Sequence, residues 1–127
     1  QVYVVRHVVE KKHYVMKVIK LRGLPRSERE ATRNEVTLMQ RLPHPNIVAY
    51  KDSFTVQGGD KLCIVMTFCD GGDLSKRVEK GRIAEAQVLH WFVQAALGLH
   101  FMHTNKVLHR DIKTQNIFLL GNGRLVL

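Results

Sequence analysis

Residues 107–120 read VLHRDIKTQNIFLL, and this stretch is the most informative part of the chain. Asp111 is followed two residues later by Lys113 and five residues later by Asn116. At this spacing a carboxylate can orient and deprotonate a hydroxyl, an ammonium can reach a phosphate, and an amide can hold a magnesium ion. The apolar runs on both sides predict a loop between short strands, where reactive side chains are commonly placed. The pattern therefore favours phosphoryl-transfer chemistry over a charged surface turn.

The composition is that of a globular protein the size of one ordinary domain. The chain has 127 residues, of which 45% are hydrophobic, and no apolar run approaches the roughly 20 residues of a membrane span. No signal-peptide pattern opens the chain. Cys63 and Cys69 are too few for a disulfide framework and form no C-x-x-C pair. We therefore expect an intracellular protein in a reducing compartment, without a zinc site.

Both ends of the chain read as parts of a larger fold. Gln1 is not an initiator Met, strand-like sequence begins at Val2, and residues 124–127 are strand-like to the last position. Natural termini are usually exposed segments with few contacts. We expect both ends to lie inside a longer protein.

The net charge of +9 favours binding to phosphates, acidic partners or nucleic acid. The basic residues between positions 17 and 41 are spread along an expected helix and its approach, with no aromatic residues interleaved. This distribution argues against nucleic acid as a partner. A basic nucleic-acid-binding module remains an alternative, and it would bind DNA or RNA with strong salt dependence.

Alternating and β-branched segments predict strands, and segments with helical periodicity predict helices. We expect strands at 2–9, 13–20, 47–56 and 61–68, and helices at 27–41, 73–80 and 84–103. The first helix should begin with a capping box, with Ser27 at the N-cap and Glu30 three residues later. Residues 62–66 are apolar throughout, as in a strand buried on both faces.

The last expected helix carries an apolar stripe that we assign to the core rather than to a cofactor. The stripe consists of Val88, Phe92, Ala96, Leu99 and His103. His100 and His103 are three residues apart, but no third ligand follows to complete a metal site.

Five segments together carry a family resemblance: YVMK at 14–17, HPNIV at 44–48, FCDGGDL at 68–74, WFVQ at 91–94, and residues 108–118. The chain resembles the middle of a eukaryotic protein kinase catalytic domain, and most of all the NIMA-related Ser/Thr kinases. The resemblance implies an α+β, bilobal, truncated kinase-like fold. It places a partial, strand-rich N-lobe with one helix at 1–66, a hinge at 67–70, and a partial C-lobe with two helices and the catalytic loop at 71–127.

The resemblance also implies ATP-dependent transfer of the γ-phosphate to Ser or Thr hydroxyls of a protein substrate, with ATP and Mg²⁺ as cofactors. Asp111 would be the base, and Lys113 would stabilise charge on the γ-phosphate. Lys17 would hold the α- and β-phosphates as a buried or half-buried cation paired with Glu35. Asn116 would be a magnesium ligand.

A nucleotide pocket can be assigned by the same resemblance. Val2 and Val15 would line it, Met66 would be the gatekeeper, and Phe118 would form its floor. Thr67, Phe68 and Cys69 would be the hinge that bonds the adenine edge through its backbone, and Asp73 would contact the ribose. For each apolar member the alternative is ordinary core packing. A reactive thiol at the pocket rim is a second interpretation of Cys69, and a plain buried or half-buried thiol is favoured over it.

Two expectations concern the whole protein. Only the last two positions of the glycine-rich loop are present, and the Asp-Phe-Gly motif should begin about two residues after Leu127, so we expect these residues alone to transfer no phosphate. The alternative function is a pseudokinase or scaffold. The family resemblance implies a cytoplasmic protein associated with the cytoskeleton, the centrosome or the basal body.

Overall fold

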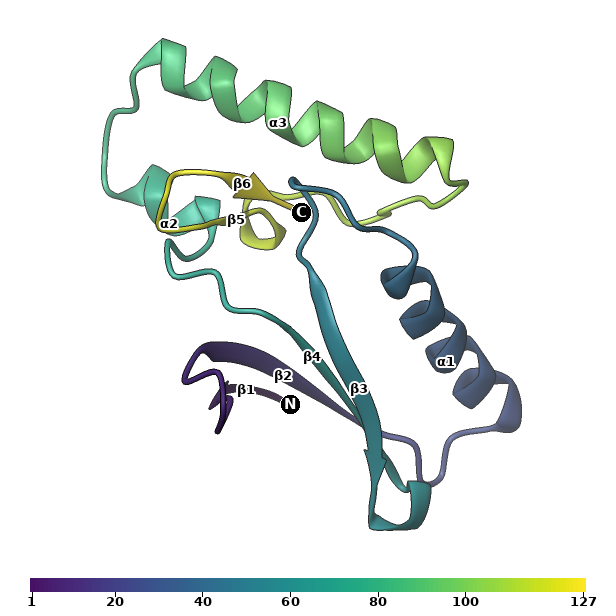
Figure 1. The fold of residues 1–127 in the computed structure, drawn as a ribbon. Helices are drawn as coiled ribbons and strands as arrows, with labels where there is room; N and C mark the ends of the chain where they lie inside the picture. Colours follow the sequence, from purple (N-terminus) through teal and green to yellow (C-terminus); the bar gives the residue numbers. More distant parts are fainter. The chain divides into compact units, whose positions relative to one another are not determined.

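The computed structural model describes all residues 1–127, which form two compact units (Figure 1). The first unit comprises residues 1–43 and 49–68, and the second comprises 44–48 and 69–127. An antiparallel sheet precedes the helices of the second unit, so the expected α+β class is confirmed. None of the helices is long and apolar enough to span a bilayer.

The first unit is built on a four-stranded antiparallel sheet in the order β1-β2-β4-β3. Its strands are β1 (Val2–Arg6), β2 (His13–Lys20), β3 (Tyr50–Val56) and β4 (Lys61–Thr67). In β4, the consecutive residues Leu62, Cys63 and Ile64 are all buried, as predicted for a strand covered on both faces. The strand expected at 2–9 ends at Arg6 instead, because the chain turns there and leaves Val9 82% exposed.

Helix α1 (Arg26–Gln40) packs against one face of this sheet. Its buried Val36 joins a core with Leu21, Leu62 and Ile64. The predicted capping box is wrong, since the N-cap is Pro25 and no side chain caps the helix. Proline has a fixed φ and begins the helix earlier than the sequence suggested, which places Ser27 inside the first turn.

A small polar network fastens the β1–β2 turn to β3. The Glu10 carboxylate accepts hydrogen bonds from Lys51 Nζ at 2.6 Å and from the Tyr14 hydroxyl. Lys51 Nζ also lies 5.6 Å from the centroid of the Tyr14 ring. The Lys51 ammonium, followed by the Tyr14 hydroxyl, lowers the pKa of Glu10 from 4.5 to about 2.

This pKa predicts a pH dependence of stability. Because the pKa of Glu10 is lower in the folded state, its contribution is present above pH 4.5 and is lost as the pH falls towards about 2. Glu10→Gln should therefore flatten the change in unfolding free energy across this window, measured by urea denaturation at several pH values. Glu79→Gln, an exposed residue without an ion pair, is the matched control. Identical slopes for the two variants would contradict the prediction.

The second unit combines two helices with a short hairpin. Its elements are α2 (Leu74–Glu79), α3 (Glu85–Thr104), the 3-10 turn η2 (Thr114–Asn116), β5 (Phe118–Leu119) and β6 (Leu125–Val126). β5 pairs with β6 and forms an isolated bridge between Phe118 and Asp73. The hairpin is thereby held against the segment that leads into α2. The strand expected at 107–108 does not form.

The apolar stripe assigned to the core lies mainly on the exposed side of α3. Phe92 is 70% exposed and Val88 is 48% exposed, whereas Trp91, Gly98 and Met102 are buried. Helix α3 is apolar around most of its circumference, so periodicity alone could not choose the packed face.

The packed face of α3 is defined instead by a buried asparagine. Asn46 Nδ2 donates to Gln94 Oε1 at 3.0 Å and to the Leu125 carbonyl oxygen at 2.9 Å. The Leu127 amide donates to the Asn46 carbonyl oxygen at 3.0 Å. A Cβ at Gly98 would lie only 2.8 Å from that carbonyl oxygen, so this helix position must be glycine for the segment 44–48 to approach. Asn46 therefore connects segment 44–48, α3 and β6.

Replacing Asn46 by Ala should destabilise the protein. The Leu125 carbonyl would lose its side-chain donor inside a packed region, which should lower the unfolding free energy by about 2 kcal/mol. Urea denaturation followed by circular dichroism measures this loss. Asn34→Ala, on the exposed face of α1, should stay within about 0.5 kcal/mol of the wild type. Equal effects of the two substitutions would show that the buried amide contributes little.

Candidate active site

The sheet register brings together four of the predicted nucleotide-binding residues of the first unit. Lys17 pairs with Val2 on one side and with Ile64 on the other, and Val15 pairs with Met66. Directly opposed residues of antiparallel strands point to the same face of the sheet. Ile64 lies in the core beneath α1, so the predicted residues share the sheet face that α1 packs against.

The expected environment of Lys17 is not found. Lys17 is exposed rather than half-buried, Glu35 on α1 is also exposed, and no ion pair joins them. An ammonium in contact with water requires no counter-charge, because solvent screens it. The expected burial and pairing of Lys17 are therefore absent from this structure.

The predicted hinge residues fall at the boundary between the two units. Thr67 and Phe68 end the first unit, and Cys69 begins the resumed second unit. The Thr67 amide donates to the Ala49 carbonyl oxygen at 3.0 Å. Burial, together with the nearby Asp70 charge, raises the pKa of the Cys69 thiol to about 11. The thiol is therefore protonated at neutral pH, which argues against a reactive cysteine.

In the second unit, the loop after α3 places two predicted residues around the carboxylate of a third. Lys113 Nζ lies 3.2 Å from Asp111 Oδ2. Asn116 Nδ2 donates to the same oxygen at 2.7 Å and to the Asp111 carbonyl oxygen at 3.0 Å. The Lys113 ammonium is the main cause of a lowered pKa at Asp111, and Asn116 lowers it further. The carboxylate is ionised at neutral pH and is exposed to an incoming hydroxyl donor.

The backbone of this loop is held in an uncommon conformation. Arg110 has a φ of 66°, in the left-handed region that residues other than glycine seldom adopt. The Asp111 amide donates to His109 Nδ1 at 3.3 Å, and the Leu74 amide donates to the Ile117 carbonyl oxygen at 2.8 Å. The first contact is internal to the loop, and the second fixes its C-terminal end.

The side-chain oxygen of Asn116 is suited to bind a magnesium ion. Its Nδ2 makes both hydrogen bonds to Asp111, so its Oδ1 is left without a protein donor. Mg²⁺ prefers oxygen ligands, and an amide oxygen beside a carboxylate meets that preference.

Asp73 is engaged locally. Its Oδ1 accepts hydrogen bonds from Ser75 Oγ at 2.5 Å and from the Lys76 amide at 3.0 Å, and it thereby caps α2. The Ser75 hydroxyl, followed by the Lys76 amide, lowers the pKa of Asp73 to about 2. A ribose hydroxyl would have to share this carboxylate with the helix. The predicted pocket floor, Phe118, is half-buried in β5.

Comparison with known sequences decides the family. The family model described as "Protein kinase domain" matches residues 1–127, the whole chain. This chain belongs to the protein kinase family. The stretch 107–120 lies within the region that this family model matches.

Curated relatives of this kinase chain are serine/threonine-protein kinases of the Nek group, which confirms the NIMA-related resemblance. This chain is 48% identical over 124 residues to Nek5 of Homo sapiens, and the alignment covers 95% of this chain and 17% of Nek5. It is 47% identical to Nek4 of Mus musculus, over 94% of the chain and 15% of the relative. For Nek1 of Mus musculus the identity is 46%, over 97% of the chain and 10% of the relative. The chain therefore spans less than a fifth of the length of these proteins.

The cluster around Asp111 makes a prediction about its ionisation. Lys113→Met removes the main cause of the lowered pKa, so the pKa of Asp111 should rise towards its ordinary value. Carboxyl-carbon NMR titration of the full-length protein measures this shift. Lys106→Met removes a positive charge from the same unit without contacting Asp111, and it should leave the titration unchanged. An unaltered pKa in Lys113→Met would mean that the ion pair is not populated in solution.

Proposed function

We propose that the protein containing this chain is an ATP-dependent protein serine/threonine kinase. The observation that carries the proposal is the cluster in which Lys113 and Asn116 both contact Asp111. The names of the Nek relatives support Ser and Thr as the acceptor residues. The substrate is a protein side-chain hydroxyl, and the phosphate donor is ATP with Mg²⁺.

Asp111 acts on the substrate hydroxyl. Because its pKa is lowered, it is a weak base and binds the hydroxyl chiefly as a hydrogen-bond acceptor. It takes the proton only when the oxygen has begun to bond to phosphorus. Lys113 stays beside the carboxylate and is positioned to stabilise negative charge on the phosphate in transfer. In this proposal the chain supplies orientation and electrostatic stabilisation, which dominate phosphoryl transfer.

Asn116 Oδ1 is the proposed magnesium ligand, and the ion would neutralise phosphate charge when bound. Lys17 is the proposed ligand of the α- and β-phosphates, with Glu35 as its counter-charge in the nucleotide-bound enzyme. The remaining proposed nucleotide contacts are apolar packing by Val2, Val15, Met66 and Phe118, backbone hydrogen bonds from residues 67–69, and a ribose contact from Asp73.

The alternative is a pseudokinase or scaffold that keeps the fold without transferring phosphate. The presence of Lys17, Asp111, Lys113 and Asn116 favours the enzyme, since a scaffold does not need that combination of residues. The expectation that residues 1–127 alone transfer no phosphate stays a prediction. We also propose a cytoplasmic site of action, with association to the cytoskeleton, centrosome or basal body by analogy with the family.

Turnover by the full-length protein tests the proposal. Asp111→Asn should lower kcat for a generic Ser/Thr peptide by roughly 10² to 10⁴-fold, because the hydroxyl loses its acceptor. Phosphate incorporation from labelled ATP measures this loss, and Asp52→Asn on β3 is the matched control. Stabilisation by Mg-ATP in a thermal-shift assay should persist in Asp111→Asn and weaken in Lys17→Met.

The outcomes separate the alternatives. Mg-ATP binding without turnover in the unmodified protein would favour the pseudokinase. The absence of both, together with salt-dependent binding to DNA or RNA, would favour the nucleic-acid-binding module.

A further inference from the structure

A polar depression lies between α3 and the β5–β6 turn, within the second unit. It encloses about 320 Å³ and is lined by Gln87, His90, Gln94, Asn122, Gly123 and Arg124. None of these residues takes part in the proposed phosphoryl transfer.

Three hydrogen-bond acceptors of the depression are occupied by the protein itself, whereas the side-chain acceptors of Gln87 and His90 are not. Gln94 Oε1 accepts hydrogen bonds from Asn46 Nδ2 at 3.0 Å and from the Leu125 amide at 2.8 Å. Asn122 Oδ1 accepts from the Arg124 amide at 3.0 Å. The Gly123 carbonyl oxygen accepts from Trp91 Nε1 at 3.1 Å. An incoming donor would have to compete for each of these three oxygens.

The donors, in contrast, are unused. Both partners of Gln94 Oε1 are N–H groups, so the amide cannot be flipped, and its NH₂ group is left without a protein acceptor. The NH₂ group of Asn122 and the guanidinium of Arg124 also donate to no protein group. The depression therefore offers donors and a full positive charge.

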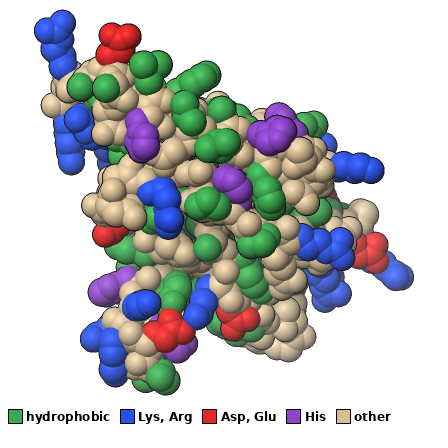
Figure 2. Space-filling view, turned by 45° about the horizontal axis from the view of Figure 1, so that its top comes forward, with side chains coloured by type: hydrophobic (Ala, Val, Ile, Leu, Met, Phe, Trp, Pro, Cys, Tyr) green, Lys and Arg blue, Asp and Glu red, His purple; other side chains and the backbone are tan.

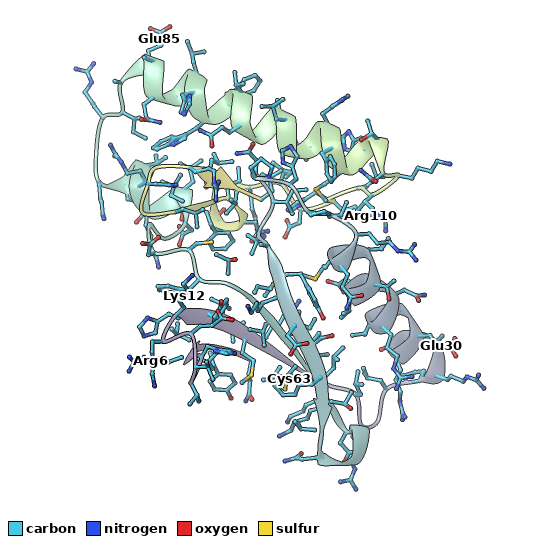
Figure 3. The ribbon with its side chains drawn as sticks, in the orientation of Figure 1. Arg6, Lys12, Glu30, Cys63, Glu85 and Arg110 are labelled. Atoms are coloured by element: carbon cyan, nitrogen blue, oxygen red, sulfur yellow. The ribbon has the colours of Figure 1, made fainter.

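No carboxylate neutralises this charge from within. The lining residues include neither Asp nor Glu. Glu85, at the start of α3, lies on the side of the helix away from the β5–β6 hairpin (Figure 3). The space-filling view shows blue Lys and Arg side chains in excess of red carboxylates, in keeping with the net charge of +9 (Figure 2).

We propose that this depression is a docking site for an acidic protein segment, whose Asp or Glu carboxylates bind Arg124 and the amide groups of Gln94 and Asn122. The donor excess selects an anion, because carboxylate oxygens accept hydrogen bonds and donate none. Four of the lining residues, His90, Asn122, Gly123 and Arg124, are exposed, so water competes strongly for a small anion. A polypeptide presents several carboxylates on one chain and adds contacts around the depression, so it suits an open site better.

Peptide binding to the full-length protein in the absence of nucleotide tests this site separately from kinase activity. The probe is a fluorescein-labelled 12-residue peptide rich in Glu, and the same peptide with Gln at every Glu position is its control. The Glu peptide should bind, with an affinity that falls as salt is added, and the Gln peptide should not. Fluorescence anisotropy measures both.

Two substitutions locate the binding. Arg124→Gln should lower the affinity for the Glu peptide roughly three- to tenfold, because one charge-assisted contact is lost at an open site. Asn122→Asp keeps the side-chain oxygen that accepts a hydrogen bond from the Arg124 amide, but it adds a negative charge. It should therefore weaken binding of the Glu peptide at least as much as Arg124→Gln does. Arg33→Gln removes one exposed, unpaired charge from α1 and should leave binding unchanged. Circular dichroism melts confirm that each variant is folded.

Several results would overturn the proposal. Equal binding of the Glu and Gln peptides would exclude anion recognition. Loss of binding in Arg33→Gln but not in Arg124→Gln or Asn122→Asp would assign the acidic peptide to another surface. Complete displacement of the peptide by an equal concentration of inorganic phosphate would indicate a small-anion site rather than a docking site.

Discussion

The hydrogen bonds of the buried Asn46 side chain hold together three segments of the second unit. Its amide NH₂ group is shared between Gln94 on α3 and the carbonyl oxygen of Leu125 on β6. A buried amide must satisfy its hydrogen bonds, so it tolerates few arrangements of its neighbours, whereas apolar packing tolerates many. The flanking residues on both sides of segment 44–48 belong to the first unit. The Asn46 side chain acts together with backbone hydrogen bonds from Leu127 to the Asn46 carbonyl oxygen and from Val48 to the Leu127 carbonyl oxygen.

The same organisation extends to the loop that carries Asp111. Residues 71–74 form hydrogen bonds with Ile117 and Leu119, directly after the loop, while β6 is held by Asn46 and Gln94. The loop itself has few buried residues, and the anchored β5–β6 hairpin on its C-terminal side holds it in place. Its charges are arranged locally, and the Asp111 carboxylate is stabilised by a cation and an amide from its own loop. Rigid neighbours and a locally balanced carboxylate together suit the substrate-orienting role proposed for Asp111.

The parts of the structure that could be read from the sequence are those with a local signal. The strand at 13–20 has the expected bounds, and β4 is buried on both faces as its apolar run predicted. The cluster of Asp111, Lys113 and Asn116 could also be predicted from the sequence, because its members lie within six consecutive residues.

The remaining features depend on contacts between distant residues. Asn46 and Gln94 are 48 positions apart, and neither position carries a periodicity that would reveal a buried hydrogen bond. The packed face of α3 follows from that contact, which is why an apolar stripe centred on Phe92 was assigned to the core although it is exposed. The capping box failed for a different reason, since Pro25 had already fixed the backbone at the start of α1. The conformation of Lys17 and Glu35 is set by tertiary structure and is not encoded in either segment alone.

The single tryptophan of these 127 residues also has a consequence for spectroscopy. Trp91 is 7% exposed, and its indole N–H is bonded to the carbonyl oxygen of Gly123, at the edge of the polar depression. Indole emission is sensitive to hydrogen bonding and to the polarity around the ring. Within this chain the intrinsic fluorescence therefore reports on one spot, the junction of α3 with the β5–β6 turn, and it provides a label-free optical signal for events there.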